Sequence, residues 1–297
     1  MSPRAFPGKV ASGFPFGNAT NKEDRAFSRF YLKRKGSKRN GALFAFLALL
    51  ALPAGAQEKA ISIPDFSGWW EGPGFDLAPP ESGGPGPVTN ASSNIQWPEG
   101  DYKNPILQPW AAEQVKHWAE ESHAGRAPAH AHALCLPTSV PGVMTLHQGY
   151  SFLQQKDEVT VIIGNQAQVR HIYLNVPHSK NVKPSWYGES VGHYEGDTLV
   201  VDTTGIKTRD VVPFDRFGTP HTEKLHVVER FRRMNAREIR IDYHIEDPGV
   251  FTRPFDASLT FHPFKEGFGE DPCSENNVDP FTGQPVKGMP VDLHPVF

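Results

Sequence analysis

From Tyr150 onward, apolar and polar residues alternate in short runs, which is the pattern of half-buried β-strands. Turn-forming residues separate most of these runs, and no helical stretch intervenes. Neighbouring strands should therefore pair antiparallel, because short connections return the chain alongside itself. The pattern predicts eight strands, at residues 150–155, 158–163, 167–174, 188–194, 198–204, 224–233, 238–246 and 256–262.

Eight short strands without crossover helices predict a mainly β fold. An antiparallel up-and-down barrel of the lipocalin-like kind, or a strongly curved sheet, would bury one face and protect the strand edges. A β-sandwich is the competing topology.

Two segments precede the strands. Residues 57–105 are rich in proline and glycine and predict an extended arm, whose aromatic residues indicate packing on the main body. One helix should begin near Pro109 and end at Gly125, with an apolar stripe formed by Ala111, Val115, Trp118 and Ala119. We expect residues 106–297 to form a single barrel domain with this helix at its start and an irregular tail from Asp271.

The first 56 residues have the three parts of a signal peptide. A basic segment at residues 29–39 precedes an apolar run, Ala42 to Leu52, and the small residues Ala54 to Ala56 follow. The apolar run is about half of the roughly 20 residues that a membrane-spanning helix needs. We therefore expect export to the periplasm or the extracellular space, cleavage after Ala56, and no membrane span afterwards. Residues ahead of the basic segment make the n-region unusually long.

Removal of this segment changes the charge balance. Residues 1–56 hold 10 of the 30 basic side chains and 2 of the 33 acidic ones, so the remaining chain has 20 bases, 31 acids and a formal charge of −11. Nucleic acids and anionic bilayers are bound through Lys and Arg surfaces, so neither is expected as a partner. A small-molecule ligand or substrate is the expected partner, and the oligomeric state stays open.

The chain contains two cysteines, Cys135 and Cys273. In an oxidising compartment an even pair predicts one disulfide, here between the segment before the strands and the tail. A catalytic thiol is the alternative. A zinc site would need close ligand pairs such as C-x-x-C, which the sequence lacks.

Several motifs carry a resemblance to a known family. They include CLP at residues 135–137, SVGHYEGDTLVVDT at 190–203, GTPHTEKLHVVERFRR at 218–233 and IEDPGVFTRPF at 245–255. Over residues 65–277 the chain resembles a family of exported bacterial β-proteins with an SVGxxEGDTLVVDT hairpin motif. The resemblance implies a shared fold, a signal peptide and a periplasmic or extracellular setting, and it implies no particular reaction. The chain departs from the family pattern in its His-rich segment before Cys135 and in its CSENN tail motif.

The hairpin around Glu195, Gly196 and Asp197 is explained by its turn, because glycine supplies the positive φ and aspartate caps the bend. Asp202 differs, since it lies in a strand among apolar neighbours. A buried carboxylate needs a partner, so Asp202 is either paired or functional. Alternation also places Glu229 on the apolar face of its strand.

These considerations select two groups of candidate residues. The expected catalytic side chains are those that could transfer a proton, namely His221, Asp202, Glu229 and His193. The expected substrate-binding side chains are Tyr243, His226, Trp186 and Tyr173. The histidines form no specific metal motif, so no metal ligands are assigned, although a metal stays possible.

No phosphate loop, G-x-S-x-G elbow, H-E-x-x-H motif or dinucleotide fingerprint is present. We therefore expect a cofactor-independent lyase, isomerase or hydratase that binds a small, largely apolar molecule and uses a His/carboxylate pair. Two alternatives stay open: a non-catalytic carrier or sensor of a hydrophobic ligand, and a structural or interaction protein of the cell envelope. Convergence of His221, Glu229 and Asp202 on one cavity would favour an enzyme.

Overall fold

The computed structural model describes residues 63–72, 74, 76–92, 98–124, 131, 135–147, 149–208, 213–265, 267 and 269. The expected signal peptide and the tail from Asp271 lie outside these residues, as does Cys273. The predicted disulfide and the cleavage after Ala56 therefore stay predictions.

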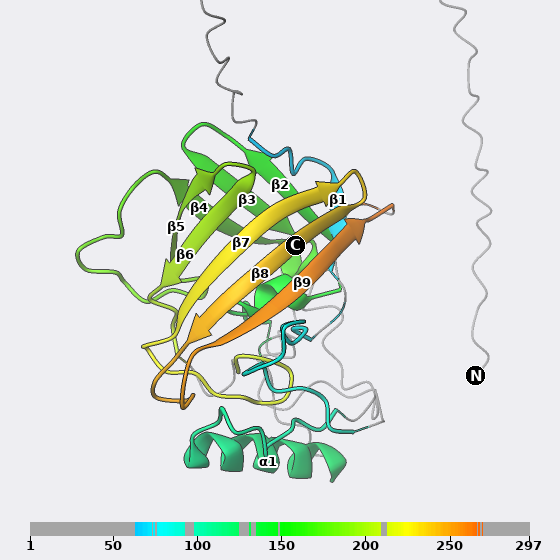
Figure 1. Cartoon of the computed structure of the whole chain (residues 1–297), viewed down its shortest axis with the longest axis vertical. Coiled ribbons are helices and arrows are strands. Elements are labelled where there is room, and N and C mark those ends of the chain that lie inside the picture. Colours follow the sequence, from blue (N-terminus) through cyan, green and yellow to red (C-terminus); the bar gives the residue numbers. More distant parts are fainter. Residues whose placement is uncertain are drawn as a thin grey trace, which may run out of the picture. The chain divides into compact units, whose positions relative to one another are not determined.

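The described residues form a closed barrel of nine strands, arranged in chain order (Figure 1). This architecture confirms the mainly β barrel class and the single helix, and it differs from the β-sandwich that was the competing topology. The strands are β1 (Trp69–Glu71), β2 (Gly149–Gln154), β3 (Glu158–Ile163), β4 (Gln168–Leu174), β5 (Glu189–Glu195), β6 (Thr198–Thr204), β7 (His226–Asn235), β8 (Glu238–Glu246) and β9 (Phe255–Pro263). Eight of them match the predicted strands to within two residues.

Strand β1, in the segment expected to be an arm, closes the barrel. Trp70 pairs with Tyr150 of β2 on one side and with Pro263 of β9 on the other. The arm packs on the barrel as expected, because Phe66 and Trp70 are buried and the Trp70 indole Nε1 donates a hydrogen bond of 2.9 Å to the Phe66 carbonyl. Residues 57–105 therefore contribute one strand to the barrel.

The pairing of β4 with β5 departs from the prediction that all neighbours run antiparallel. These two strands are parallel, with Ile172 opposite Ser190 and Leu174 opposite Gly192. Parallel neighbours need a long connection, because the chain must return to the end at which it started. Residues 175–188 make this connection, which projects from one side of the barrel in Figure 1. This connection carries His178.

Large side chains fill the barrel interior. Phe152, Phe231 and Phe261 are at most 2% exposed, and the Phe152 and Phe231 rings meet edge to face with centroids 6.0 Å apart. Arg170 and Glu229 also point inward and are fully buried. The Arg170 guanidinium contacts both Glu229 carboxylate oxygens and donates hydrogen bonds to the hydroxyls of Ser190 and Thr203. A buried charge needs such partners. Arg170 and Glu229 find theirs inside the barrel, in each other and in the two hydroxyls.

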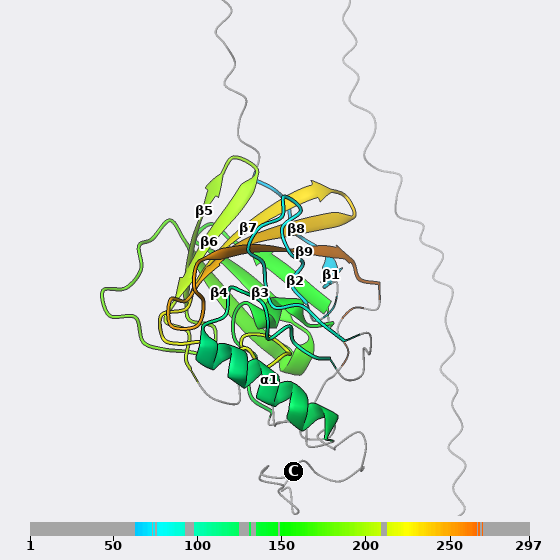
Figure 2. The same ribbon diagram turned by 60° about the horizontal axis from the view of Figure 1, so that its bottom comes forward.

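Helix α1 (Pro109–His123) lies outside the barrel, as Figure 2 shows from a second direction. Ala111, Val115 and Ala119 form its buried face, which agrees with the predicted stripe. Trp118 packs closely on the chain at Gly218, where an added Cβ would come within 2.4 Å of the indole ring. The predicted stop at Gly125 lies outside the described residues. Within the part of the chain that the structure describes, no helix is long and apolar enough to cross a membrane.

Candidate active site

A row of ionisable side chains crosses the outer face of the barrel over four neighbouring strands. The strand register builds it: Glu189 of β5 pairs with Thr204, two residues beyond Asp202 of β6, and His226 of β7 pairs with Glu246 of β8. Asp202 in turn pairs with Val228, two residues from His226. Residues two apart in a strand share a face, so these four side chains lie diagonally or directly beside one another.

Both ring nitrogens of His226 contact carboxylates. Nδ1 lies 2.7 Å from Glu246 Oε1, and Nε2 lies 2.9 Å from Asp202 Oδ1. A neutral imidazole has only one N–H, so two carboxylate partners favour the doubly protonated imidazolium form. Burial alone would lower the pKa of His226, but the Glu246 and Asp202 carboxylates outweigh it and raise that pKa above 6.5.

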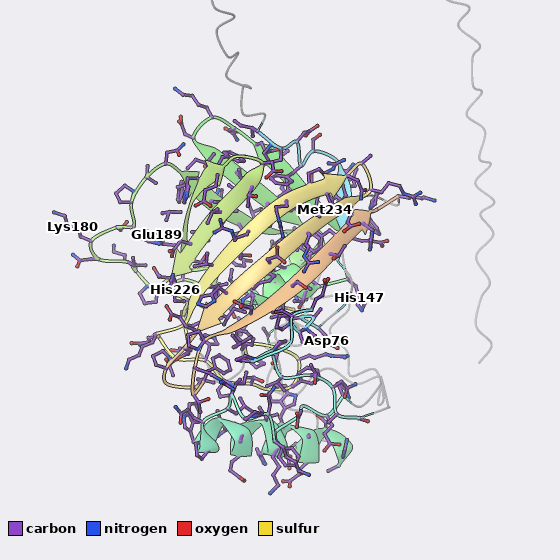
Figure 3. The ribbon with its side chains drawn as sticks, viewed as in Figure 1. Asp76, His147, Lys180, Glu189, His226 and Met234 are labelled. Atoms are coloured by element: carbon purple, nitrogen blue, oxygen red, sulfur yellow. The ribbon has the colours of Figure 1, made fainter. Side chains whose placement is uncertain are left out.

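A second imidazole reaches the same carboxylate from the connection between β4 and β5. His178 Nε2 lies 3.0 Å from Asp202 Oδ1, and His178 Nδ1 lies 3.0 Å from Glu189 Oε1. Glu189 also accepts hydrogen bonds from the Ser179 hydroxyl and backbone N–H, and these bonds lower its pKa. Figure 3 shows Glu189 and His226 on the side of the barrel from which the connection bearing Lys180 projects.

The five side chains thus form two carboxylate–imidazole dyads, Glu189–His178 and Glu246–His226, whose Nε2 atoms converge on Asp202 Oδ1. We call this set the dyad cluster. A carboxylate on Nδ1 fixes the orientation of an imidazole and leaves Nε2 as the reactive nitrogen, which is the arrangement used in acid–base catalysis. The His178 and His226 side chains are 27% and 29% exposed, so both are accessible to a solute.

The surroundings of the dyad cluster are partly apolar. Val191 of β5 and Val228 of β7 flank Asp202 directly in the sheet register. Trp186 lies on the same connection as His178, and the Lys207 ammonium sits 5.1 Å from the Trp186 ring centroid. Backbone hydrogen bonds between Ser185 and both Gly205 and Lys207 fasten the connection to the chain beyond β6. The site therefore offers apolar contacts next to proton-transfer groups.

No protein-family model matches this sequence, and a search of curated proteins finds no significant match. The resemblance to the exported β-proteins with the SVGxxEGDTLVVDT motif is therefore still a prediction. The function has to be argued from the geometry of the side chains.

Of the predicted site residues, the structure brings Asp202 and His226 together. A third, Trp186, lies on the same connection as His178. Glu229 and Tyr243 lie instead inside the barrel, paired across β7 and β8. Glu229 is engaged by Arg170, and burial raises the pKa of the Tyr243 hydroxyl well above its usual value. Asp202 points outward and Glu229 inward. These carboxylates therefore do not converge on one cavity, which was the arrangement that would have favoured an enzyme.

The other candidates also lie apart from the dyad cluster. His221 is buried in the loop before β7. His193 is 53% exposed and lies 3.0 Å from its near neighbour Glu195. Tyr173 is 46% exposed and stacks beside His171, with ring centroids 6.4 Å apart. Their assigned roles are untested, and the structure gives them no shared site.

Sequence reasoning missed His178 and Arg170. Arg170 could have been found, because alternation within β4 places it on the face that also carries Ile172 and Leu174. His178 had no such signal, since it lies outside any strand. Within the described residues, no group of three or more His, Cys, Asp or Glu side chains has an arrangement that could hold a metal ion. Cys135 is among the described residues, but its predicted partner is not.

Proposed function

We propose that this protein is an exported enzyme of the lyase, isomerase or hydratase type. In this proposal His178 and His226 transfer protons to and from a small, largely apolar substrate, without a cofactor. The observation that carries it is the convergence of two oriented imidazole Nε2 atoms on Asp202 Oδ1, 3.0 and 2.9 Å away. Reactions of this type remove a proton from one atom and return one to another, so two such groups suffice.

In both dyads the Nε2 atom is the nitrogen that a substrate can reach more easily. Glu246 and Glu189 hold the Nδ1 atoms, and each would lose its only imidazole partner if a substrate displaced it. Asp202 is shared, so it keeps one imidazole when a substrate displaces it from the other. The Nε2 atoms are therefore the expected points of contact with the substrate. The raised pKa of His226 favours its charged form, which suits it to donate the proton.

The substrate would lie on the outer face, against Val191, Val228 and the half-buried Trp186. This placement differs from a site inside the barrel. Inward-facing Arg170, Glu229 and Phe231 are fully buried there, and their side chains fill the space that a carried ligand would need. The filled lumen therefore gives little support to the alternative that the protein carries a hydrophobic ligand.

The filled lumen favours one second candidate, the structural or interaction protein of the cell envelope. In that case the dyad cluster would only fasten the connection over residues 175–188 to the barrel. The two candidates differ in one property, because only an enzyme accelerates proton transfer in a bound small molecule.

Proton exchange with solvent tests the proposal before the reaction is known. The chain from Gln57 would be incubated in D2O with a panel of small carbonyl compounds that carry apolar substituents, and loss of C–H signals would be followed by ¹H NMR. His226→Gln and His178→Gln remove the two transferring groups. His244→Gln is the matched control, since His244 of β8 is also exposed and paired with a carboxylate, Asp256, and has no assigned role.

We expect exchange of at least one compound to fall by about 10²- to 10⁴-fold in His226→Gln and to be unchanged in His244→Gln. Equal exchange in all three variants would refute the roles of both imidazoles. If no compound exchanged and the variants differed from the parent protein only in stability, the interaction protein would be the better reading.

A further inference from the structure

The connection between β4 and β5 is fastened to the barrel by backbone bonds at its two ends. At its start, the Asn175 N–H donates to the Gly192 carbonyl at 2.8 Å, and near its end the Ser185 N–H donates to the Gly205 carbonyl at 3.1 Å. Within the described residues, no backbone–backbone hydrogen bond joins the stretch between these points, residues 176–184, to the barrel. We call residues 176–184 the strap.

Polar side chains hold the strap against the barrel, and three of the contacts meet on Glu189 of β5. Its carboxylate accepts hydrogen bonds from the Ser179 hydroxyl at 2.5 Å and from the Ser179 backbone N–H at 2.7 Å, and it lies 3.0 Å from His178 Nδ1. A fourth contact joins His178 Nε2 to Asp202 Oδ1 at 3.0 Å. Loss of the Glu189 charge would therefore weaken three of these four contacts at once.

The strap buries little apolar surface. Its residues are exposed except for His178 and Val182, which are half-buried. Val182 packs on the chain at Gly205, where an added Cβ would come within 2.2 Å of the Val182 Cγ1 atom. Figures 1 and 3 show the connection projecting from the barrel, with Lys180 toward its outer end. Few apolar contacts resist separation of the strap from the barrel, so the contacts with the two carboxylates decide whether it stays there.

The protonation state of His178 sets how many of these contacts form. An imidazole that faces two carboxylates uses both N–H groups, and the neutral ring has only one. Histidine changes its charge between about pH 5 and 8. The charged ring therefore holds the strap by both nitrogens, whereas at alkaline pH the neutral ring holds it by one. The other charged and titratable groups nearby are Glu246 of β8, His226 of β7, Lys207 after β6, and Lys180 and Lys183 of the strap itself.

We propose that the strap opens and closes over the dyad cluster as one unit, with Glu189 as its latch, and that opening increases as the pH rises. In the closed form both imidazoles contact Asp202. In the open form His178 leaves Asp202 Oδ1, while His226 keeps its contact because it belongs to β7. A small molecule then has room between the two imidazoles. This use of the opening rests on the proposed function, whereas the opening itself does not.

Two backbone amides distinguish an opening strap from a connection as rigid as the barrel. The Asn175 N–H is bonded to β5 in both forms, whereas the Ser179 N–H is bonded to Glu189 only in the closed form. The test measures exchange of these two amides with solvent by NMR, at pH 6 and pH 8.5, in the chain from Gln57. Each rate would be compared with the intrinsic rate of an unfolded chain at the same pH, which gives a protection factor.

Three variants complete the experiment. Glu189→Gln keeps the shape of the latch and removes its charge. His178→Gln removes the titratable ring. Glu246→Gln is the matched control, because Glu246 is the corresponding carboxylate of the other dyad and holds His226, whose position is fixed by the barrel itself.

We expect the Ser179 protection factor to be about tenfold lower in Glu189→Gln than in the parent protein, since a hydrogen bond to a charged group contributes more than one to a neutral group. Glu246→Gln should leave this factor unchanged, and Asn175 should keep its protection in every variant. In the parent protein the Ser179 factor should fall from pH 6 to pH 8.5. The latch stays charged over this range, because the Ser179 bonds lower the pKa of Glu189. In His178→Gln the factor should be low at both pH values.

Equal Ser179 protection in Glu189→Gln and Glu246→Gln would overturn the proposal, and so would a simultaneous loss of protection at Asn175. Should Glu189→Gln fail to fold, the parent protein decides, because a Ser179 protection factor that ignores the pH would refute the latch. If the strap opened in this way while no compound exchanged protons in D2O, the strap would stand and the proposed enzyme activity would be wrong.

Discussion

Replacing Glu229 with glutamine removes one charge from the ion pair inside the barrel. Both Glu229 and Arg170 have side chains that are 0% exposed, and the guanidinium has Glu229 as its carboxylate partner. The hydroxyls of Ser190 and Thr203 also accept from Arg170, but they carry no charge. Glu229→Gln therefore leaves a buried cation with hydrogen bonds and without an anion.

Breaking a buried pair in this way costs about 3–5 kcal/mol of the free energy of unfolding. For a domain of this size, a loss of 1 kcal/mol lowers Tm by about 2–4 °C, so a fall of roughly 6–20 °C is expected. Urea denaturation followed by tryptophan fluorescence and by far-UV circular dichroism would measure the free energy directly. Coincident transitions from the two signals would justify a two-state treatment.

Glu195→Gln is the matched control, because Glu195 pairs with Arg230 on the surface, where both side chains are nearly half exposed. Surface pairs contribute about 0–1 kcal/mol, so this variant should be close to the parent protein. A double variant, Arg170→Met with Glu229→Leu, removes both charges and should recover most of the loss. If Glu229→Gln were no more destabilising than Glu195→Gln, the barrel interior would be hydrated and the buried-charge reasoning would be wrong.

Three further predictions concern two titratable groups and the expected signal peptide. The pKa of His226 is raised in the folded protein, so its pairing with the carboxylates stabilises the fold fully below pH 6.5, and this stabilisation is lost as the pH rises. Asp202→Asn should therefore reduce the free energy of unfolding more at pH 5.5 than at pH 9, as measured by urea denaturation. Asp215 also has a raised pKa, but as an acid it destabilises the fold once it ionises. Asp215→Asn should accordingly gain about 3 kcal/mol relative to the parent protein between pH 3.5 and pH 7.5, and a pH-independent difference would contradict the assignment. Expression of the full chain in a secreting bacterium should yield a mature protein that begins at Gln57, and intact-mass spectrometry would reveal any other cleavage site.

Alternation along β7 and β8 predicted much of the barrel interior. Leu225, Val227, Glu229 and Phe231 occupy every second position, so alternation assigns them to one face, and all four are buried. The same two-residue period assigns Asp202 to the face opposite to Leu199 and Val201, and it groups Tyr243 with the apolar residues of β8; the structure agrees on both points. These predictions succeed because side-chain direction in a strand repeats every two residues and depends only on the local chain.

Strand β1 and the parallel pair β4–β5 could not be predicted in the same way. A strand of three residues, Trp69–Glu71, is too short to establish a period, and its partners lie near positions 150 and 263. The parallel pair depends on where residues 175–188 lead the chain. Both features are set by contacts between distant segments, whose closure has no local signature.

The sequence by itself determined the β class, the approximate strand bounds and the faces of the long strands. The burial expected for Asp202, from which its need for a partner was argued, is wrong, because the side chain faces outward and is 41% exposed. It has imidazole partners all the same. Only the tertiary structure decided what these partners are. Asp202 meets His226 through the strand register, and it meets His178 because a parallel crossover folds residues 175–188 back against β5 and β6. Strand periodicity is a property of neighbouring residues, whereas the meeting of two imidazoles on one carboxylate is a property of the closed barrel and its connections.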